Sequence, residues 1–140
     1  MLSGEFRHSI DQKNRVFLPA KLREELGDTL MITRDIREKC LKVFSIEGWQ
    51  AYIAPIKQQE RAIWEPTLRV LNSMGTQAEP DAQGRVLLPA RLVKYAEIEK
   101  NAVIVGCGDY AEIWAEGNYD RMVEDIDFDK LRQALEACGL

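Results

Sequence analysis

The sequence predicts a mixed α/β, β-rich protein in which two related units of about seventy residues combine into one pseudo-twofold barrel with peripheral helices. A motif recurs at an offset of seventy in a chain of 140 residues. Each copy has room for four short strands and one small helix, which is too little for an independent core. The composition, 46% hydrophobic and 30% charged, is that of an ordinary globular protein.

The repeated motif spans residues 11–22 and recurs at 81–92. Seven of its twelve positions are identical (Asp, Arg, Val, Leu, Pro, Ala and Leu), and Lys21 is matched by Arg91. The same offset aligns Trp49 with Tyr119 further along the chain. The chain is therefore two copies of one unit.

Each copy begins with a short extended segment, at 6–10 and 75–79, that leads into a turn. Asn14 and Gly84 stand where such a turn most often requires a positive φ, which these residue types tolerate best. Apolar strands follow at 15–18 and 85–88, and each ends at a proline. Proline suits the first position of a helix, so helices are predicted at 20–26 and 90–96.

The rest of each copy supplies two more strands, predicted at 29–33 and 41–44 and again at 103–106 and 112–115. Helices are predicted at 46–54, 56–72, 117–126 and 129–138. The expected organisation is a first unit over 1–54, a helical connection over 55–73, a second unit over 74–120 and a C-terminal helical tail over 121–140.

Little in the sequence could support catalysis. His8 is the only histidine, and no GxSxG, HExxH or Walker motif is present. Three scattered cysteines favour reduced thiols in the cytosol over a disulfide framework or a CxxC metal site. No stretch is apolar for long enough to cross a membrane. We therefore expect a cytoplasmic protein that is not an enzyme, with no cofactor, metal or small-molecule substrate.

The net charge of −4 conceals a segregated pattern. Residues 1–70 hold twelve basic and ten acidic residues, whereas residues 71–140 hold seven basic and thirteen acidic ones. Both copies of the motif are locally basic, and nine acids lie from Asp109 onward. Two related basic turns on one pseudo-symmetric body form a candidate phosphate-binding face.

Two interpretations of the motif's arginines remain open at this point. Arg15 and Arg85 directly follow a tight turn, where a planar guanidinium could reach a guanine edge or a phosphate. Alternatively, the Asp-x-x-x-Arg spacing from Asp11 and Asp81 could form an ion pair that holds the turn and contacts no ligand. A solvated helix face is the favoured interpretation for the remaining cations of the motif helices, Lys21, Arg23, Arg91 and Lys94.

With these motifs the chain resembles the MraZ family of bacterial regulators, which contain two tandem SpoVT-AbrB-type units. The resemblance covers nearly the whole chain. Its segments are Gly4-Glu5-Phe6 with His8, Asp11-Gln-Lys-Asn-Arg15, Pro19-Ala-Lys-Leu-Arg23-Glu-Glu-Leu, Thr33-Arg34, Cys40-Leu-Lys-Val-Phe, Trp49, Asn72-Ser-Met-Gly75, Glu79-Pro-Asp-Ala-Gln-Gly-Arg85, Val105-Gly106 and Glu112-Ile-Trp114. Asn14 stands where the family usually has glycine. In the second copy Gln83 stands where the first copy has Lys13, which suggests that the two turns contribute unequally.

The resemblance implies a swapped-hairpin β-barrel of the AbrB type and a homo-oligomeric ring of about eight or more subunits. It implies binding to repeated short G-rich promoter sites in double-stranded DNA, at the division and cell-wall gene cluster, often as a repressor and in association with the nucleoid. By position, Arg15 and Arg85 are the expected DNA contacts. The supporting candidates are Lys13, Arg7 and Lys21, and the turn-stabilising ones are Asp11, Asp81, Asn14 and Gly84.

An alternative function is a protein-interaction module of the antitoxin type, with the same barrel but without operator control. AbrB-type antitoxins usually carry one motif copy and a disordered toxin-binding tail. This chain has two copies and a helix-compatible tail, which favours the DNA-binding interpretation.

Overall fold

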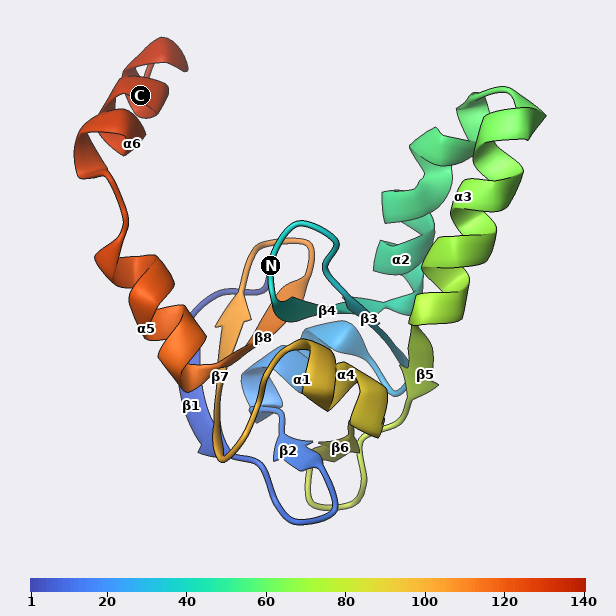
Figure 1. The fold of residues 1–140 in the computed structure, drawn as a ribbon, viewed down its shortest axis with the longest axis vertical. Helices are drawn as coiled ribbons and strands as arrows, with labels where there is room; N and C mark the ends of the chain where they lie inside the picture. The colour runs from blue at the N-terminus through green and yellow to red at the C-terminus, as the bar shows by residue number, and fades with distance from the viewer.

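The computed structural model describes all residues, Met1 to Leu140 (Figure 1). The first copy contains β1 (Glu5–Ser9), β2 (Arg15–Phe17), α1 (Ala20–Leu26), β3 (Leu30–Arg34) and β4 (Cys40–Ser45). The second contains β5 (Thr76–Ala78), β6 (Arg85–Leu87), α4 (Ala90–Tyr95), β7 (Asn101–Gly106) and β8 (Ala111–Ala115). Strands and helices thus recur in the same order, and the predicted mixed α/β class is confirmed.

The two copies exchange strands within one antiparallel sheet. Its order is β1-β7-β8-β4-β3-β5, so β1 of the first copy pairs with β7 of the second, and β5 pairs with β3. The remaining strands, β2 and β6, form a separate two-stranded antiparallel ribbon. The strands therefore form an open six-stranded sheet and a ribbon, and they do not close into the barrel that the sequence predicts.

The ribbon lies on the pseudo-twofold axis. Val16 faces Val86 at its centre, and both side chains are fully buried. The Leu18 N–H donates to the Gly84 carbonyl at 2.9 Å, and the Leu88 N–H donates to the Asn14 carbonyl at 2.8 Å. These reciprocal hydrogen bonds tie the turn of each copy to the strand end of the other.

One hydrophobic core serves both copies. It contains nineteen buried residues, drawn from β2, α1, β3 and β4 as well as from β6, α4, β7 and β8. Leu18, Leu22, Leu88 and Leu92 are at most 1% exposed within it. Truncating such a buried leucine to alanine typically costs about 2–5 kcal/mol. Because one cluster contains residues of both copies, the two copies share a single core.

Two helical arms leave the sheet and diverge on the same side of it (Figure 1). The first arm consists of α2 (Ile46–Ile53), the 3₁₀ helix η1 (Ala54–Gln58) and α3 (Arg61–Met74). The second arm consists of α5 (Glu116–Glu124) and α6 (Phe128–Ala137). Two of these helices have a side-chain N-cap. Ser45 Oγ accepts from the Gly48 N–H, and Asp127 Oδ1 accepts from the Lys130 N–H.

The prediction of one continuous helix over 56–72 is wrong, because the helical structure is interrupted between η1 and α3, where the chain reverses direction. Pro55 lies at the start of η1, and Gln59 is extended, which ends the first segment. The connection therefore forms a helical hairpin with α2, in which Trp49 of α2 and Leu68 of α3 pack with Met31 and Phe44 of the sheet. No helix of the chain is both long and apolar enough to span a membrane.

Candidate nucleic-acid interface

The turn before β2 is organised by one carboxylate. Asp11 Oδ1 accepts the backbone N–H groups of Lys13 and Arg15, each at 2.9 Å, and the Asn14 N–H donates to the Asp11 carbonyl at 3.0 Å. Asn14 has φ of 61°, the left-handed conformation that asparagine tolerates. The hydrogen bond from the Arg15 N–H is the largest influence on the Asp11 carboxyl and holds its pKa below the ordinary value.

The second copy reproduces this turn. Asp81 Oδ1 accepts the N–H groups of Gln83 and Arg85, each at 2.9 Å, and Gly84 has φ of 79°. The Arg85 N–H again has the largest effect, and the pKa of Asp81 is lowered like that of Asp11. Both turns are thus built from local side-chain chemistry that the motif encodes.

Each motif arginine forms an ion pair with the aspartate of its own turn. This ion pair is compatible with a contact between the same arginine and DNA. Arg15 Nε donates to Asp11 Oδ2 at 2.7 Å, and Arg85 Nε donates to Asp81 Oδ2 at 2.9 Å. Neither guanidinium uses its terminal nitrogens in a hydrogen bond within the chain, although Arg85 Nη1 lies 4.0 Å from Asp11 Oδ2. The ion pair fixes the guanidinium through one edge and leaves the other edge available to a ligand.

The β2–β6 ribbon brings both arginines to one surface. Arg15 pairs with Leu87, and Arg85 pairs with Phe17. Because alternate residues of a strand point to opposite faces, these four lie on the face opposite the buried valines. Arg15 and Arg85 are each about a third exposed there, and Leu87, the partner of Arg15 in the ribbon, is 60% exposed.

The supporting candidates separate into two groups. Lys13 lies exposed in the first turn, and Lys21 lies exposed on α1. Arg7 instead lies on β1 and is held by Asp120 at 2.9 Å and by carboxylates of Glu5 and Glu116. The hydrogen bond with Asp120 is the main reason that the pKa of Arg7 is raised. The structure thus places Arg7 among acids of the second arm and apart from the two turns.

Arg23 is a residue that the sequence reasoning assigned to a solvated helix face, and this interpretation is wrong. Its Nε donates to the Leu18 carbonyl at 2.8 Å, and its guanidinium lies over the Phe17 ring at 5.6 Å. A Cβ added at Gly84 would lie only 2.7 Å from Arg23 Cζ. A difference between the two copies could have indicated this packing. Gly84 corresponds to Asn14 and Arg23 corresponds to Val93, so the glycine and the arginine that meet both replace larger or apolar counterparts.

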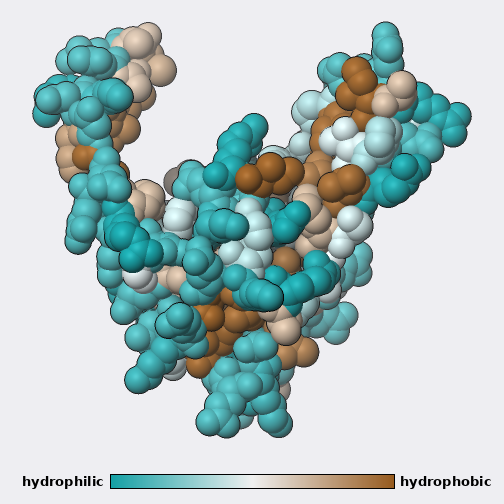
Figure 2. All heavy atoms as spheres, viewed as in Figure 1, coloured by the Kyte–Doolittle hydropathy of each residue, from teal (hydrophilic) through white to brown (hydrophobic).

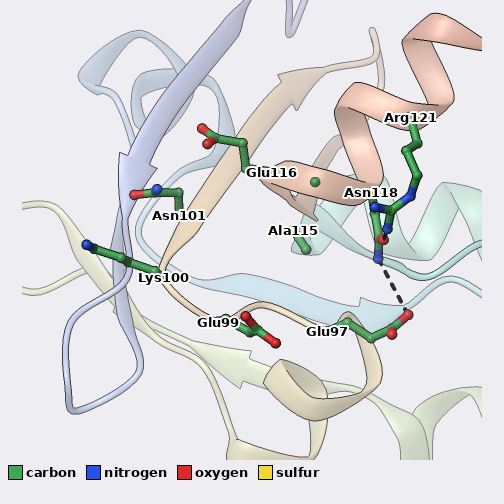
Figure 3. Close-up of a pocket in the computed structure, with 9 residues that line it drawn as sticks. Glu97, Glu99, Lys100, Asn101, Ala115, Glu116, Asn118 and Arg121 are labelled. Atoms are coloured by element: carbon green, nitrogen blue, oxygen red, sulfur yellow. Dashed lines mark hydrogen bonds between the residues drawn. The ribbon is translucent and has the colours of Figure 1, made fainter.

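A hollow of about 380 Å³ lies at the start of α5, beside the second arm (Figure 3). Three carboxylates line it, from Glu97, Glu99 and Glu116, together with the cations of Lys100 and Arg121. The Asn118 amide donates to Glu97 across its edge at 3.5 Å. None of the lining residues belongs to either turn or to the β2–β6 ribbon, so this hollow does not extend the arginine surface of the ribbon.

Comparison with known proteins divides the chain into the same two copies. The family described as "MraZ protein, putative antitoxin-like" matches residues 1–68 and 73–137, one segment for each copy. A protein from Caldicellulosiruptor bescii named "Transcriptional regulator MraZ" is 35% identical over 144 aligned positions, which cover 100% of both chains.

Two further relatives carry the same name. The one from Desulfitobacterium hafniense is 38% identical and covers 89% of this chain and 90% of its own length. The one from Carboxydothermus hydrogenoformans is 40% identical and covers 83% of this chain and 82% of its own length. Together, the duplicated turn, the exchanged strands and these matches show that the chain belongs to the MraZ family.

Proposed function

We propose that this chain is a sequence-specific DNA-binding regulator of transcription that reads DNA with its two ion-paired turns. The observation that carries the proposal is the presentation of Arg15 and Arg85 on one face of a two-stranded ribbon. A ribbon of this width fits the major groove of B-DNA. The name of the relatives, transcriptional regulator, supports the same function.

The turns act by preorganising the arginines. Asp11 and Asp81 hold each Nε, so little rotamer freedom is lost when the terminal nitrogens bind a guanine edge or a phosphate. Lys13 at the tip of the first turn and Lys21 on α1 supply further phosphate contacts. Gln83 has no charge at the matching tip, so the first turn contributes more affinity than the second.

The proposed target is a set of repeated short G-rich promoter sites at the division and cell-wall gene cluster, where the chain acts as a repressor in association with the nucleoid. Subunits of a ring contact successive repeats, and each contact raises the effective concentration of the next. The strand exchange of β1 and β5 supports the AbrB-type swapped-hairpin relationship that accompanies this function.

The distribution of exposed apolar side chains supports a ring of about eight or more subunits. Nine of the twelve large apolar side chains that are exposed lie on or beside the two arms, which are partly apolar in Figure 2. They are Tyr52, Ile63 and Val70 on the first arm, and Val123, Ile126, Phe128, Leu131, Leu135 and Leu140 on the second. Apolar surface at this density is typical of subunit contacts.

A mobility-shift assay tests the proposed function. Wild-type protein is expected to bind promoter DNA that carries phased repeats, and to bind weakly when the repeats are moved out of phase. Arg15→Ala is expected to weaken binding by roughly 5- to 150-fold per contact, the value of about 1–3 kcal/mol for one bidentate base contact. Arg61→Ala is the matched control, since Arg61 is an exposed arginine on α3. Equal binding by Arg15→Ala and wild type would contradict the proposal.

The description of the family as "antitoxin-like" favours a second candidate, a protein-interaction module. In that case a second protein copurifies in stoichiometric amount, and no DNA is retained at physiological salt. The same purification therefore separates the two functions.

A further inference from the structure

A hollow of about 220 Å³ lies between the first arm and the loop that follows β3. We name it the Lys42 hollow. Its walls are apolar and aromatic on the arm side, from Trp49, Tyr52 and Leu71, and cationic on the loop side, from Arg34 and Arg37. Ile36 also lines the hollow and is 66% exposed.

The floor of the Lys42 hollow is polar and incompletely satisfied. Lys42 Nζ lies 3.5 Å from Asp35 Oδ1, and both side chains are nearly buried. Thr33 is 4% exposed, and its Oγ1 has no hydrogen-bond partner in the chain. The lining contains three cations, Arg34, Arg37 and Lys42, and one carboxylate, Asp35, so it has an excess of positive charge. Arg37 forms no ion pair within the chain. An acidic group with an adjacent apolar side chain fits such a lining.

The second arm of the same chain carries that combination. Residues 124–129 contain four acids and no base, and the only other side chains are Ile126 and Phe128. Phe128 is 63% exposed and Ile126 is 37% exposed. The carboxylates of Glu124 and Asp125 form no ion pair within the chain, whereas Asp129 pairs with Arg132. We call this acidic segment at the junction of α5 and α6, with its exposed aromatic ring, the acidic knuckle.

We propose that the acidic knuckle, residues 124–129, of a second copy of this chain occupies the Lys42 hollow. The Phe128 ring packs against the arm side at Tyr52 and Leu71, and the carboxylates of Glu124 and Asp125 face Arg34 and Arg37. The contact deepens the ring in the proposed function, on which it rests, by naming the residues that join adjacent subunits.

The occupant comes from another subunit because the two arms of one chain diverge and hold α6 far from the first arm (Figure 1). The contact joins two different surfaces, so it is heterologous and leaves a pair of copies with an unfilled hollow on one copy and an unused knuckle on the other. Addition of further copies fills both until the assembly closes as a ring.

Charge reversal tests the contact by the mass of the full-length protein in solution. Arg37→Glu and Asp125→Lys are each expected to shift the wild-type assembly toward the 16.0 kDa of one chain, because each places like charges together. The two substitutions combined are expected to restore the assembly. Lys57→Glu is the matched control, since Lys57 lies on the same arm outside the hollow and is expected to leave the mass unchanged.

A second variant distinguishes loss of the contact between subunits from loss of the fold. Phe128→Ala is expected to weaken assembly while the unfolding midpoint of the separated chain stays unchanged, since the ring is exposed in the isolated chain. Intact assemblies of Arg37→Glu and Phe128→Ala would overturn this contact while leaving the ring in place. The contact is likewise overturned if the combined variant is no larger than the single variants. A wild-type protein that remains a single chain contradicts the ring itself.

Discussion

Replacing Gly84 with alanine is expected to lower the stability of the chain by about 2–3 kcal/mol, through two separable effects. Gly84 has φ of 79°, and forcing an alanine into this conformation costs about 1–2 kcal/mol. The new Cβ would also lie 2.7–2.9 Å from the guanidinium atoms of Arg23. Arg23 must move, and the loss of its part-buried hydrogen bond to the Leu18 carbonyl adds about 1 kcal/mol.

Urea unfolding at a fixed protein concentration measures both effects. With a slope of about 2 kcal/mol per molar, the midpoint is expected to fall by about 1–1.5 M. Gly108→Ala is the matched control, because Gly108 has φ of 88° but no atom near an added Cβ. It is therefore expected to show only the conformational part of the loss.

A double-mutant cycle isolates the collision. If Arg23 is first shortened to alanine, the Cβ at position 84 has space, so Gly84→Ala is expected to cost less in that background than in wild type. Strictly additive effects of the two substitutions would refute the assignment of Arg23 as a packing partner of the second turn.

Three other expectations concern the charges and thiols. Lys13→Ala is expected to reduce the slope of log affinity against log salt by about 0.9 per phosphate contact, measured by fluorescence anisotropy with promoter DNA. Asp11 and Asp81 have lowered pKa values, so their contribution to stability is present above the ordinary 3.8 and is lost as the pH falls through the lowered values. The variants Asp11→Asn and Asp81→Asn should accordingly flatten the acid limb of the unfolding midpoint against pH. Finally, iodoacetamide is expected to modify the exposed Cys138 in the native protein, while the buried Cys40, whose pKa is raised mainly by burial, reacts only on unfolding, as mass spectrometry can show.

Local chemistry explains which parts of the fold the sequence predicts well. The turns, the strands after them and the proline-started helices all depend on contacts within a few residues of Asp11, Asn14 and Pro19, and the structure has these elements within one or two residues of their expected bounds. The break after η1 was missed because the helical stripe of that segment is weak and its direction is set by packing on Phe44 and Trp49.

Long side chains account for the contacts at the site that the sequence could not predict. Arg7 and Arg23 look alike in sequence as cations near a basic motif. Their partners, however, lie on other elements: Asp120 of α5 holds Arg7, and Gly84 of the second turn accommodates Arg23. No periodicity or spacing within one copy reports such partners. The open sheet, in place of the expected closed barrel, likewise depends on pairings between distant strands.

The exchange of β1 has a consequence for how the chain is synthesised and folds. Glu5 pairs with Val105, so β1 finds its partner only after a further hundred residues have been made. Pairing across such a separation is slow, because a long loop must close before any contact forms. Until then β1 presents unpaired backbone groups that can join another nascent chain. Productive folding of this small protein is therefore largely post-translational, and it is most exposed to aggregation when many copies are translated together.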